Sequence, residues 1–315
     1  MRRLQKILLF FIFFVFVNSM RLNAEPISKV HDFSRNGIAL FLEQHYDPDF
    51  VAVYEDILLI HGLTYSSHEF DVDYFDYSIT DFLVQNGFSV WQLDIAGYGR
   101  SGAVSNGFLV DSEYASNDIL AAIEYIRKQG TDDKIDLLGW SWGTVTTSLA
   151  VAEHPEWIEA LILYAPLFRG FDGAPPSKPW HKNSWRHAAG DFQKTSDGKI
   201  NTEIAEIAVA AMFLSNAWKY DGETSPNGGR KDLMVGMDHQ LIDLKKLHVP
   251  ILLIGGTKDP NIYWDIVSGA VGELQRSERV QLVKIDGGSH ILMLEKPYYR
   301  RFQREVLKFL RTTVD

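Results

Sequence analysis

A serine framed by tryptophans and glycines, Gly139-Trp140-Ser141-Trp142-Gly143, stands where a predicted strand meets a predicted helix. Residues 134–138 are typical of a buried strand, and residues 144–152 are typical of the start of a helix. A G-x-S-x-G turn holds its serine in a strained, exposed position, and the glycines are needed because a Cβ would collide with the neighbouring strand or helix. The pattern predicts that Ser141 is a nucleophile.

A serine hydroxyl needs a base to take its proton, and the usual base is an imidazole held by a carboxylate. His290 follows Gly287-Gly288-Ser289 directly after a predicted strand, so that a loop can present its ring. The other histidines after Ser141 lie in an irregular segment, at a helix end or just before a strand: His154, His181, His187, His239 and His248. We expect His290 to be the base.

Asp259 is the expected acid, because it lies a few residues beyond the predicted strand 250–254, at the sheet edge where Ser141 emerges. Asp followed by Pro260 is also a good start for a helix, so helix capping is an alternative role. Asp286 is a second candidate acid, but its position four residues before His290 fits a turn better than a partner behind the ring.

Acyl transfer also needs N–H donors for the oxyanion. The expected donors are the backbone N–H groups of Trp142, directly after the nucleophile, and of Leu63, in the loop that follows the predicted strand 57–60. We interpret His61, in the same loop, as a structural histidine whose ring bonds to backbone.

These residues need a sheet whose strands end at one edge. Apolar β-type runs alternate with helical stretches, which predicts an α/β fold with a mostly parallel central sheet flanked by helices. The strands are expected at 57–60, 88–94, 134–139, 159–164, 250–254 and 279–285. Helices are expected at 112–129 and after Pro297.

The alternation of predicted strands and helices stops between Pro166 and Val249, where glycines and prolines are frequent. We interpret residues 167–248 as a helical cap inserted over the site, with core segments at 25–166 and 249–315; the alternative is a surface excursion on the far side. The cap contains a predicted amphipathic helix, whose apolar positions recur every three or four residues. They are Ile204, Ile207, Ala211, Leu214 and Trp218.

Residues 1–24 predict an export signal, because a basic start is followed by an apolar run from Ile7 to Val17 that is too short to span a bilayer. We expect a periplasmic or secreted protein with no stable membrane partner after cleavage; an uncleaved N-terminal anchor is the alternative. The chain has no cysteine and therefore no disulfide or thiol nucleophile.

The formal net charge of −10, without a basic stripe, argues against a nucleic-acid partner. No His, Asp or Glu motif suggests a metal, and the expected chemistry needs no organic cofactor. The expected partner is a small-molecule substrate, and the oligomeric state is not indicated.

Taken together, His61-Gly62, the turn at residues 94–101, the elbow at Ser141, Asp259 and His290 resemble the landmarks of the α/β-hydrolase fold family in order and spacing. The resemblance covers residues 50–312 and implies that Asp94 and its glycine-rich turn belong to the scaffold. Two features depart from the pattern of many relatives. The oxyanion loop has no H-G-G-G run, and both neighbours of the serine are tryptophans, so Trp140 either narrows the pocket or packs beneath it.

The expected reaction is hydrolysis of a carboxylic ester or lactone of a small to medium apolar substrate through an acyl-enzyme. An aminopeptidase is the first alternative, because the S-W-G and G-Y-G-R-S segments resemble those of proline iminopeptidases. Carbon–carbon bond hydrolysis and a ligand-binding protein on the same scaffold are the others. Aromatic cap residues are expected to line the pocket with Trp140, although a structural role fits them equally: Trp180, Trp185, Phe192, Phe213 and Trp218. Cap carboxylates available for a substrate amine are Glu203, Glu206 and Glu223.

Overall fold

The computed structural model describes residues 26–49, 55–129, 133–274, 277 and 279–312. The predicted export signal therefore lies outside the described residues. Within the described part of the chain, no helix is both long enough and apolar enough to cross a membrane.

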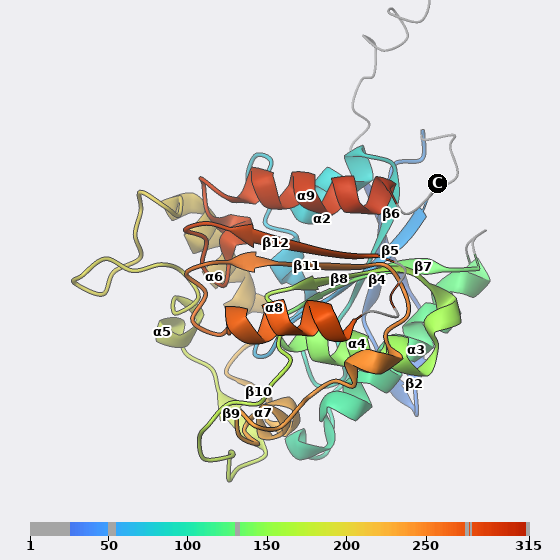
Figure 1. The fold of residues 1–315 in the computed structure, drawn as a ribbon, viewed down its shortest axis with the longest axis horizontal. Coiled ribbons are helices and arrows are strands. Elements are labelled where there is room, and N and C mark those ends of the chain that lie inside the picture. Colours follow the sequence, from blue (N-terminus) through green and yellow to red (C-terminus); the bar gives the residue numbers. More distant parts are fainter. Residues whose placement is uncertain (1–25, 50–54, 130–132, 275–276, 278, 313–315) are drawn as a thin grey trace, which may run out of the picture.

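An eight-stranded sheet in the order β1-β4-β6-β5-β7-β8-β11-β12 forms the centre of the molecule (Figure 1). The six strands from β6 to β12 in this order are parallel to one another. At the start of the order, β4 pairs antiparallel with β6, and β1 pairs antiparallel with β4. The bounds are β1 (Ile27–His31), β4 (Leu42–Tyr46), β5 (Glu55–Ile60), β6 (Phe88–Leu93), β7 (Ile135–Trp140), β8 (Ile158–Tyr164), β11 (Ile251–Gly256) and β12 (Val280–Ile285). The predicted mostly parallel α/β fold is confirmed.

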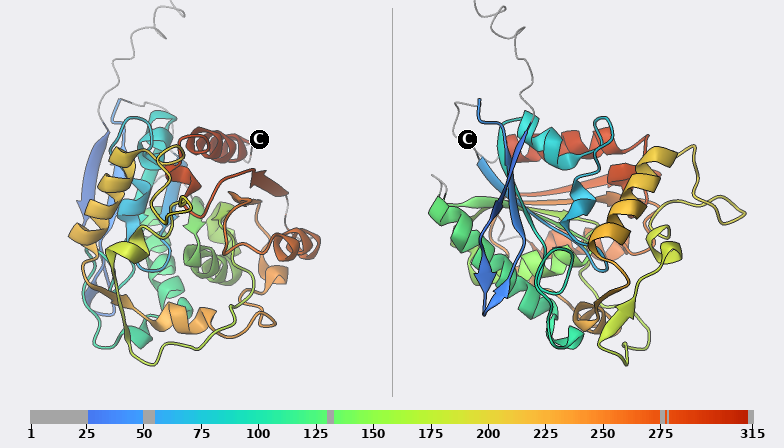
Figure 2. Two further views of the ribbon diagram at one scale, coloured as in Figure 1. Left: turned by 90° about the vertical axis from the view of Figure 1, so that its left-hand side faces the viewer. Right: turned by 180° about the vertical axis from the view of Figure 1, so that it is seen from behind.

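Helices cover both faces of this sheet, as Figures 1 and 2 show. One face carries α2 (Ile79–Gln85) and α9 (Tyr299–Arg311), and the other carries α3 (Ser112–Gln129), α4 (Trp142–Glu153) and α8 (Trp264–Glu273). In α9 the apolar side chains of Phe302, Val306, Phe309 and Leu310 are buried. Their burial against the sheet explains why this short, strongly charged helix is stable.

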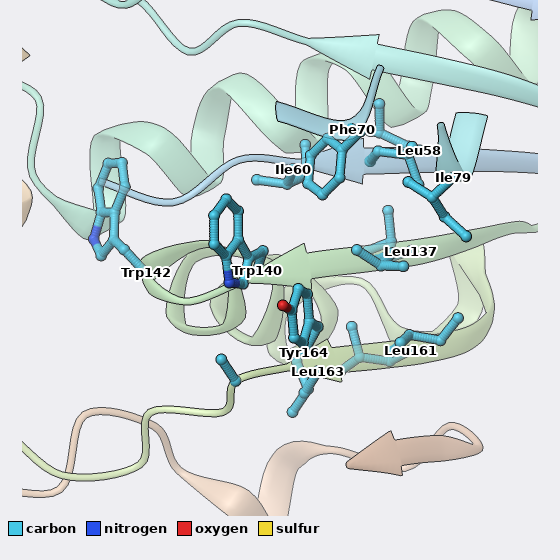
Figure 3. Close-up of a cluster of buried hydrophobic side chains, with 14 of the residues drawn as sticks. Leu58, Ile60, Phe70, Ile79, Leu137, Trp140, Trp142, Leu161, Leu163 and Tyr164 are labelled. Carbon is cyan, nitrogen blue, oxygen red and sulfur yellow. The ribbon is translucent and has the colours of Figure 1, made fainter. Parts of the chain in front are cut away.

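The core lies between the sheet and its helices, where branched aliphatic side chains from neighbouring strands meet aromatic ones (Figure 3). Leu58, Leu137 and Leu161 come from β5, β7 and β8 and are fully buried. Each such side chain contributes about 1.5–3 kcal/mol through removal from water. This packing holds the three strands that lead to the candidate nucleophile and its neighbouring loops.

The segment between β8 and β11 contains short elements and one long helix. They are β9 (Trp180–Lys182), α5 (Trp185–Ala188), α6 (Ile207–Tyr220), β10 (Thr224–Pro226), α7 (Gly228–Leu233) and η4 (Leu244–Lys246). Helix α6 packs on η1 (Ser67–Phe70) and α7 on η2 (Gly107–Leu109), in the connections that follow β5 and β6. The segment thus lies over the carboxyl ends of the strands, which supports the cap interpretation; the division at 167–248 stays a prediction.

The predicted apolar stripe of the cap helix is not its buried face. Helix α6 buries Val209, Ala210, Phe213 and Ala217 instead. Ile207 and Trp218, which belong to the predicted stripe, are 70% and 39% exposed. The reason is that α6 is apolar on more than one side, so helical spacing alone did not decide which side faces the core.

Candidate active site

Ser141 lies at the turn between β7 and α4 with φ 57° and ψ −119°, a backbone conformation that residues other than glycine rarely adopt. A Cβ at Gly143 would lie 2.5 Å from the carbonyl oxygen of Ile60, so the neighbouring strand leaves no room for a side chain there. The turn keeps this strain because strand and helix are both packed around it. It directs the serine toward a cavity at the carboxyl end of the sheet.

His290 and Asp259 meet next to this turn. Nδ1 of His290 and Oδ2 of Asp259 are 2.7 Å apart, and both side chains are buried. Asp259 follows β11 and His290 follows β12, two neighbouring parallel strands. Asp259 also accepts a hydrogen bond from the backbone N–H of Asn261 through its other oxygen. Asp286, the alternative acid, instead accepts a hydrogen bond from the hydroxyl of Thr257 at an exposed position.

A cavity of about 410 Å³ brings Ser141 and His290 together with Gly62 and Leu63 of the loop after β5. Gly62 approaches the serine closely, since a Cβ there would lie 3.2 Å from the Cβ of Ser141. Trp142 is the first residue of α4, so its backbone N–H has no partner within the helix. Both expected oxyanion donors thus belong to backbone that borders the serine.

His61 has the structural role expected from the sequence. Its Nδ1 donates to the carbonyl oxygen of Gly62, and its Nε2 accepts from the backbone N–H of Ile95. The ring therefore joins the loop after β5 to the turn after β6. Asp94, in that turn, accepts hydrogen bonds from the backbone N–H groups of Ser67 and Arg100, which is a scaffold role.

A sequence model of the family described as "Serine aminopeptidase, S33" matches residues 54–297. This chain belongs to the serine aminopeptidase S33 family. It is therefore a hydrolase with the α/β-hydrolase fold, as the sequence predicted.

Other similarities of this S33 chain are weaker. A pimeloyl-[acyl-carrier protein] methyl ester esterase of Klebsiella pneumoniae is 28% identical over 163 residues, which are 51% of this chain and 54% of that protein. The chain thus spans about half the length of this curated relative. A carboxylesterase structure from Nitrososphaera gargenis is 16% identical with a TM-score of 0.62, and covers 90% of this chain and 98% of its own. A 2-hydroxy-6-oxo-6-phenylhexa-2,4-dienoate hydrolase from a Rhodococcus strain is 18% identical with a TM-score of 0.63. The match covers 91% of this chain and 99% of that one. At these identities the structures show the fold alone.

The rings of Trp140 and Trp142 lie apart from each other next to the elbow of this S33 protein (Figure 3). Trp140 stacks on Tyr164 at 5.6 Å between ring centroids and also lines the cavity, so it both packs beneath the pocket and narrows it. The indole of Trp142 is buried away from the cavity and donates to the hydroxyl of Ser112.

The five aromatic cap residues that the sequence suggested for the pocket are not among those that line the cavity, although Phe171 of the cap does line it. Trp185 and Trp218 stack on each other at 4.9 Å on the surface, where they are 50% and 39% exposed. Phe213 is fully buried against Tyr65 and Phe192, and Trp180 is half-buried in β9. The pocket expectation for these cap residues is wrong, because their rings pack on one another or on the core rather than toward the serine.

Four charged residues on the cavity wall were not identified from the sequence: Glu69, Asp172, Asp191 and Arg230. Burial, together with the neighbouring carboxylates of Asp221 and Asp191, holds the pKa of Glu69 well above its usual range. Burial raises the pKa of Asp191 to about 6. Glu203, Glu206 and Glu223 are not among the lining residues, and Glu206 accepts a hydrogen bond from Tyr77 instead.

The pH profile of ester hydrolysis should report on His290. Burial lowers the pKa of its ring, but the charge and hydrogen bond of Asp259 outweigh this and hold the pKa above the usual 6.5. A general base acts only when neutral, so activity is lost as pH falls through this raised pKa. We expect an acid limb of kcat/KM with an apparent pKa above 6.5, measured with a neutral ester across roughly pH 5 to 9. A limb at or below 6.5 would contradict the assignment.

Proposed function

We propose that this protein hydrolyses a carboxylic ester or lactone, with Ser141 as nucleophile, His290 as base and Asp259 as the acid that orients the ring. The observation that carries this proposal is the His290–Asp259 hydrogen bond of 2.7 Å beside a cavity that Ser141 lines from a strained strand-to-helix turn. Such a turn and carboxylate-held imidazole are the arrangement that activates a serine.

The reaction follows from these positions. His290 takes the hydroxyl proton as Oγ of Ser141 attacks the carbonyl carbon, and the oxyanion accepts hydrogen bonds from the N–H groups of Leu63 and Trp142. The imidazolium then gives its proton to the leaving alcohol oxygen, which leaves an acyl-enzyme. Water, deprotonated by His290, attacks the acyl carbon, releases the acid and restores the serine.

The substrate proposed is small to medium in size. A cavity of about 410 Å³ is at the lower end of the range for small-molecule sites, about 300–1,000 Å³. Part of its wall is apolar and suits an acyl chain: Leu63, Trp140, Leu167, Phe171, Leu233 and Met234. The relative from Klebsiella pneumoniae, named for an ester hydrolysis, supports the ester rather than the amide.

An aminopeptidase is the second candidate, and the carboxyl groups of Glu69 and Asp191 on the cavity wall favour it. One oxygen of Glu69 is buried without a hydrogen-bond partner among the described residues, so it is free to accept a bond from a substrate ammonium. The family's description also agrees with this activity. The raised pKa of Glu69 weighs against it, because a neutral carboxyl binds a cation weakly.

Two chromogenic substrates separate the candidates. We expect p-nitrophenyl butyrate to be hydrolysed with a kcat/KM of about 10⁴ M⁻¹s⁻¹ or more. Proline p-nitroanilide should be hydrolysed far more slowly, since the ester is the proposed substrate class. The opposite preference would establish the aminopeptidase. Hydrolysis of neither, together with no labelling by a fluorophosphonate, would refute the proposed mechanism.

A further inference from the structure

Arg230 extends a guanidinium group from α7 of the cap to the wall of the cavity that Ser141 lines. Its Nη1 donates to the hydroxyl of Ser225 and the carbonyl oxygen of Pro226, and its Nη2 donates to the hydroxyl of Thr64. Thr64 follows Leu63 directly, so the guanidinium is bonded to the loop that carries an expected oxyanion donor.

This cation has no carboxylate partner among the described residues. Its hydrogen bonds go to neutral oxygens only, and the titratable groups that interact with it are the phenols of Tyr98 and Tyr65 and the rings of His181 and His187. Burial lowers the pKa of Arg230, which is the direction expected of a desolvated charge without a counterion. Because desolvated charges are usually paired, an anion from outside the protein is the natural partner.

The N–H groups of Arg230 that have no partner among the described residues suit a carboxylate. A guanidinium has five N–H groups, and the bonds above use three of them. The Nε–H and one Nη2–H thus have no partner in the part of the chain that the structure describes. Two N–H groups of a planar fork are what a carboxylate accepts in a bidentate pair.

The position of the guanidinium sets how far this carboxylate lies from the reacting carbonyl. Gly62 borders Ser141, and Thr64 is two residues further along the loop, a span of at most about 7 Å. Leu63 and Leu233 line the cavity in the same region. A short aliphatic chain between an ester carbonyl and an acid group would fit both the span and the apolar wall.

Three carboxyl groups line the cavity, and that of Asp172 accepts a hydrogen bond from the backbone N–H of Met237. Glu69 and Asp191 interact with each other and with Asp221 and Asp259 rather than with Arg230. Burial holds the pKa of Glu69 well above its usual range, which favours its neutral form and so reduces its repulsion of an anion. Arg230 and these carboxyl groups thus line the same cavity, in which Asp191 interacts with His290.

We propose that Arg230 binds a carboxylate of the substrate, so that the preferred ester carries an acid group a short aliphatic distance from the scissile carbonyl. This inference rests on the proposed ester hydrolysis and narrows its substrate class. The competing role for Arg230 is purely structural: it would hold Thr64, whose φ is 87°, in place through the hydrogen bond from the cap.

Matched esters distinguish binding from support of the loop. The first pair is p-nitrophenyl hydrogen glutarate and p-nitrophenyl butyrate, with the acid on the acyl side. The second is 4-butyryloxybenzoate and phenyl butyrate, with the acid on the alcohol side. The quantity compared is the ratio of kcat/KM for the acidic ester to that for the neutral one, in wild type, Arg230→Gln and Arg230→Lys. Arg186→Gln is the control, because it removes the same charge from an exposed cap position.

In Arg230→Gln we expect the ratio to fall about 10- to 100-fold for at least one pair, as for loss of a hydrogen-bonded charge pair. Arg230→Lys should keep part of the preference for the acidic ester, and Arg186→Gln should leave the ratio unchanged. A fall of equal size for the acidic and neutral esters, or no change in either ratio, would establish the structural role and overturn the proposal.

Binding of glutarate, followed by calorimetry, gives a readout that does not depend on turnover. Wild type should bind it more tightly than Arg230→Gln by a similar factor. If wild type binds glutarate through Arg230 but hydrolyses none of the esters, the proposed function fails and the anion site stands. If the esters are hydrolysed but glutarate binding is the same in both proteins, the anion site fails and the function stands.

Discussion

Ser141→Ala should lower kcat for p-nitrophenyl butyrate by at least about 10³-fold, as loss of a triad nucleophile does in other enzymes. The substitution removes only Oγ and keeps the Cβ, so the strained turn with φ 57° faces no new steric demand. The loss should therefore appear in kcat while the melting temperature stays close to that of wild type. Steady-state kinetics and a thermal melt measure the two quantities.

Fluorophosphonate labelling adds a check that needs no substrate. Wild type should be modified at Ser141, and His290→Ala should remain unlabelled, because the hydroxyl needs the base. Ser148→Ala is a matched control: this serine lies on α4, and its buried hydroxyl has no hydrogen-bond partner among the described residues. Full activity in Ser141→Ala would remove this residue from the mechanism.

Local sequence patterns predicted the strands of the sheet well, because a buried parallel strand is a short continuous run of apolar residues. Strands β5, β7 and β11 are apolar runs buried on both faces, and all six predicted strands are present with ends shifted by no more than two residues. The edge strand β1 and its neighbour β4 were not predicted. Their sequences alternate with polar residues such as Lys29 and Glu43, so they lack a continuous apolar run.

The elbow, His290 and Asp259 could be found from the sequence because each follows a strand of one parallel sheet, and such strands end at a common edge. The charged residues of the cavity wall could not be found from the sequence in this way. Glu69 lies on a short 3-10 helix, while Asp191 and Arg230 come from the cap, more than a hundred residues further along the chain. Only the packing of the cap on the core brings them together, and no local pattern encodes that packing.

Asp259→Asn should lower kcat by about 10³- to 10⁴-fold, the size of effect known for loss of a triad carboxylate. An amide has no charge to stabilise the imidazolium, and it presents either an N–H or an oxygen to Nδ1, which disturbs the choice of tautomer. The fold should tolerate the change, because the amide oxygen can still accept the hydrogen bond that Asn261 now gives to Asp259.

Asp286→Asn is the control that tests the choice between the two carboxylates. Asp286 is bonded to Thr257 at the surface, so its substitution should change kcat little. The acid limb of the pH profile gives a second readout: without the charge of Asp259, the pKa of His290 should fall, and the limb should move to lower pH as kcat drops. A large loss in Asp286→Asn with none in Asp259→Asn would reverse the assignment. Loss in both without a shift of the limb would mean that neither carboxylate acts through the imidazole.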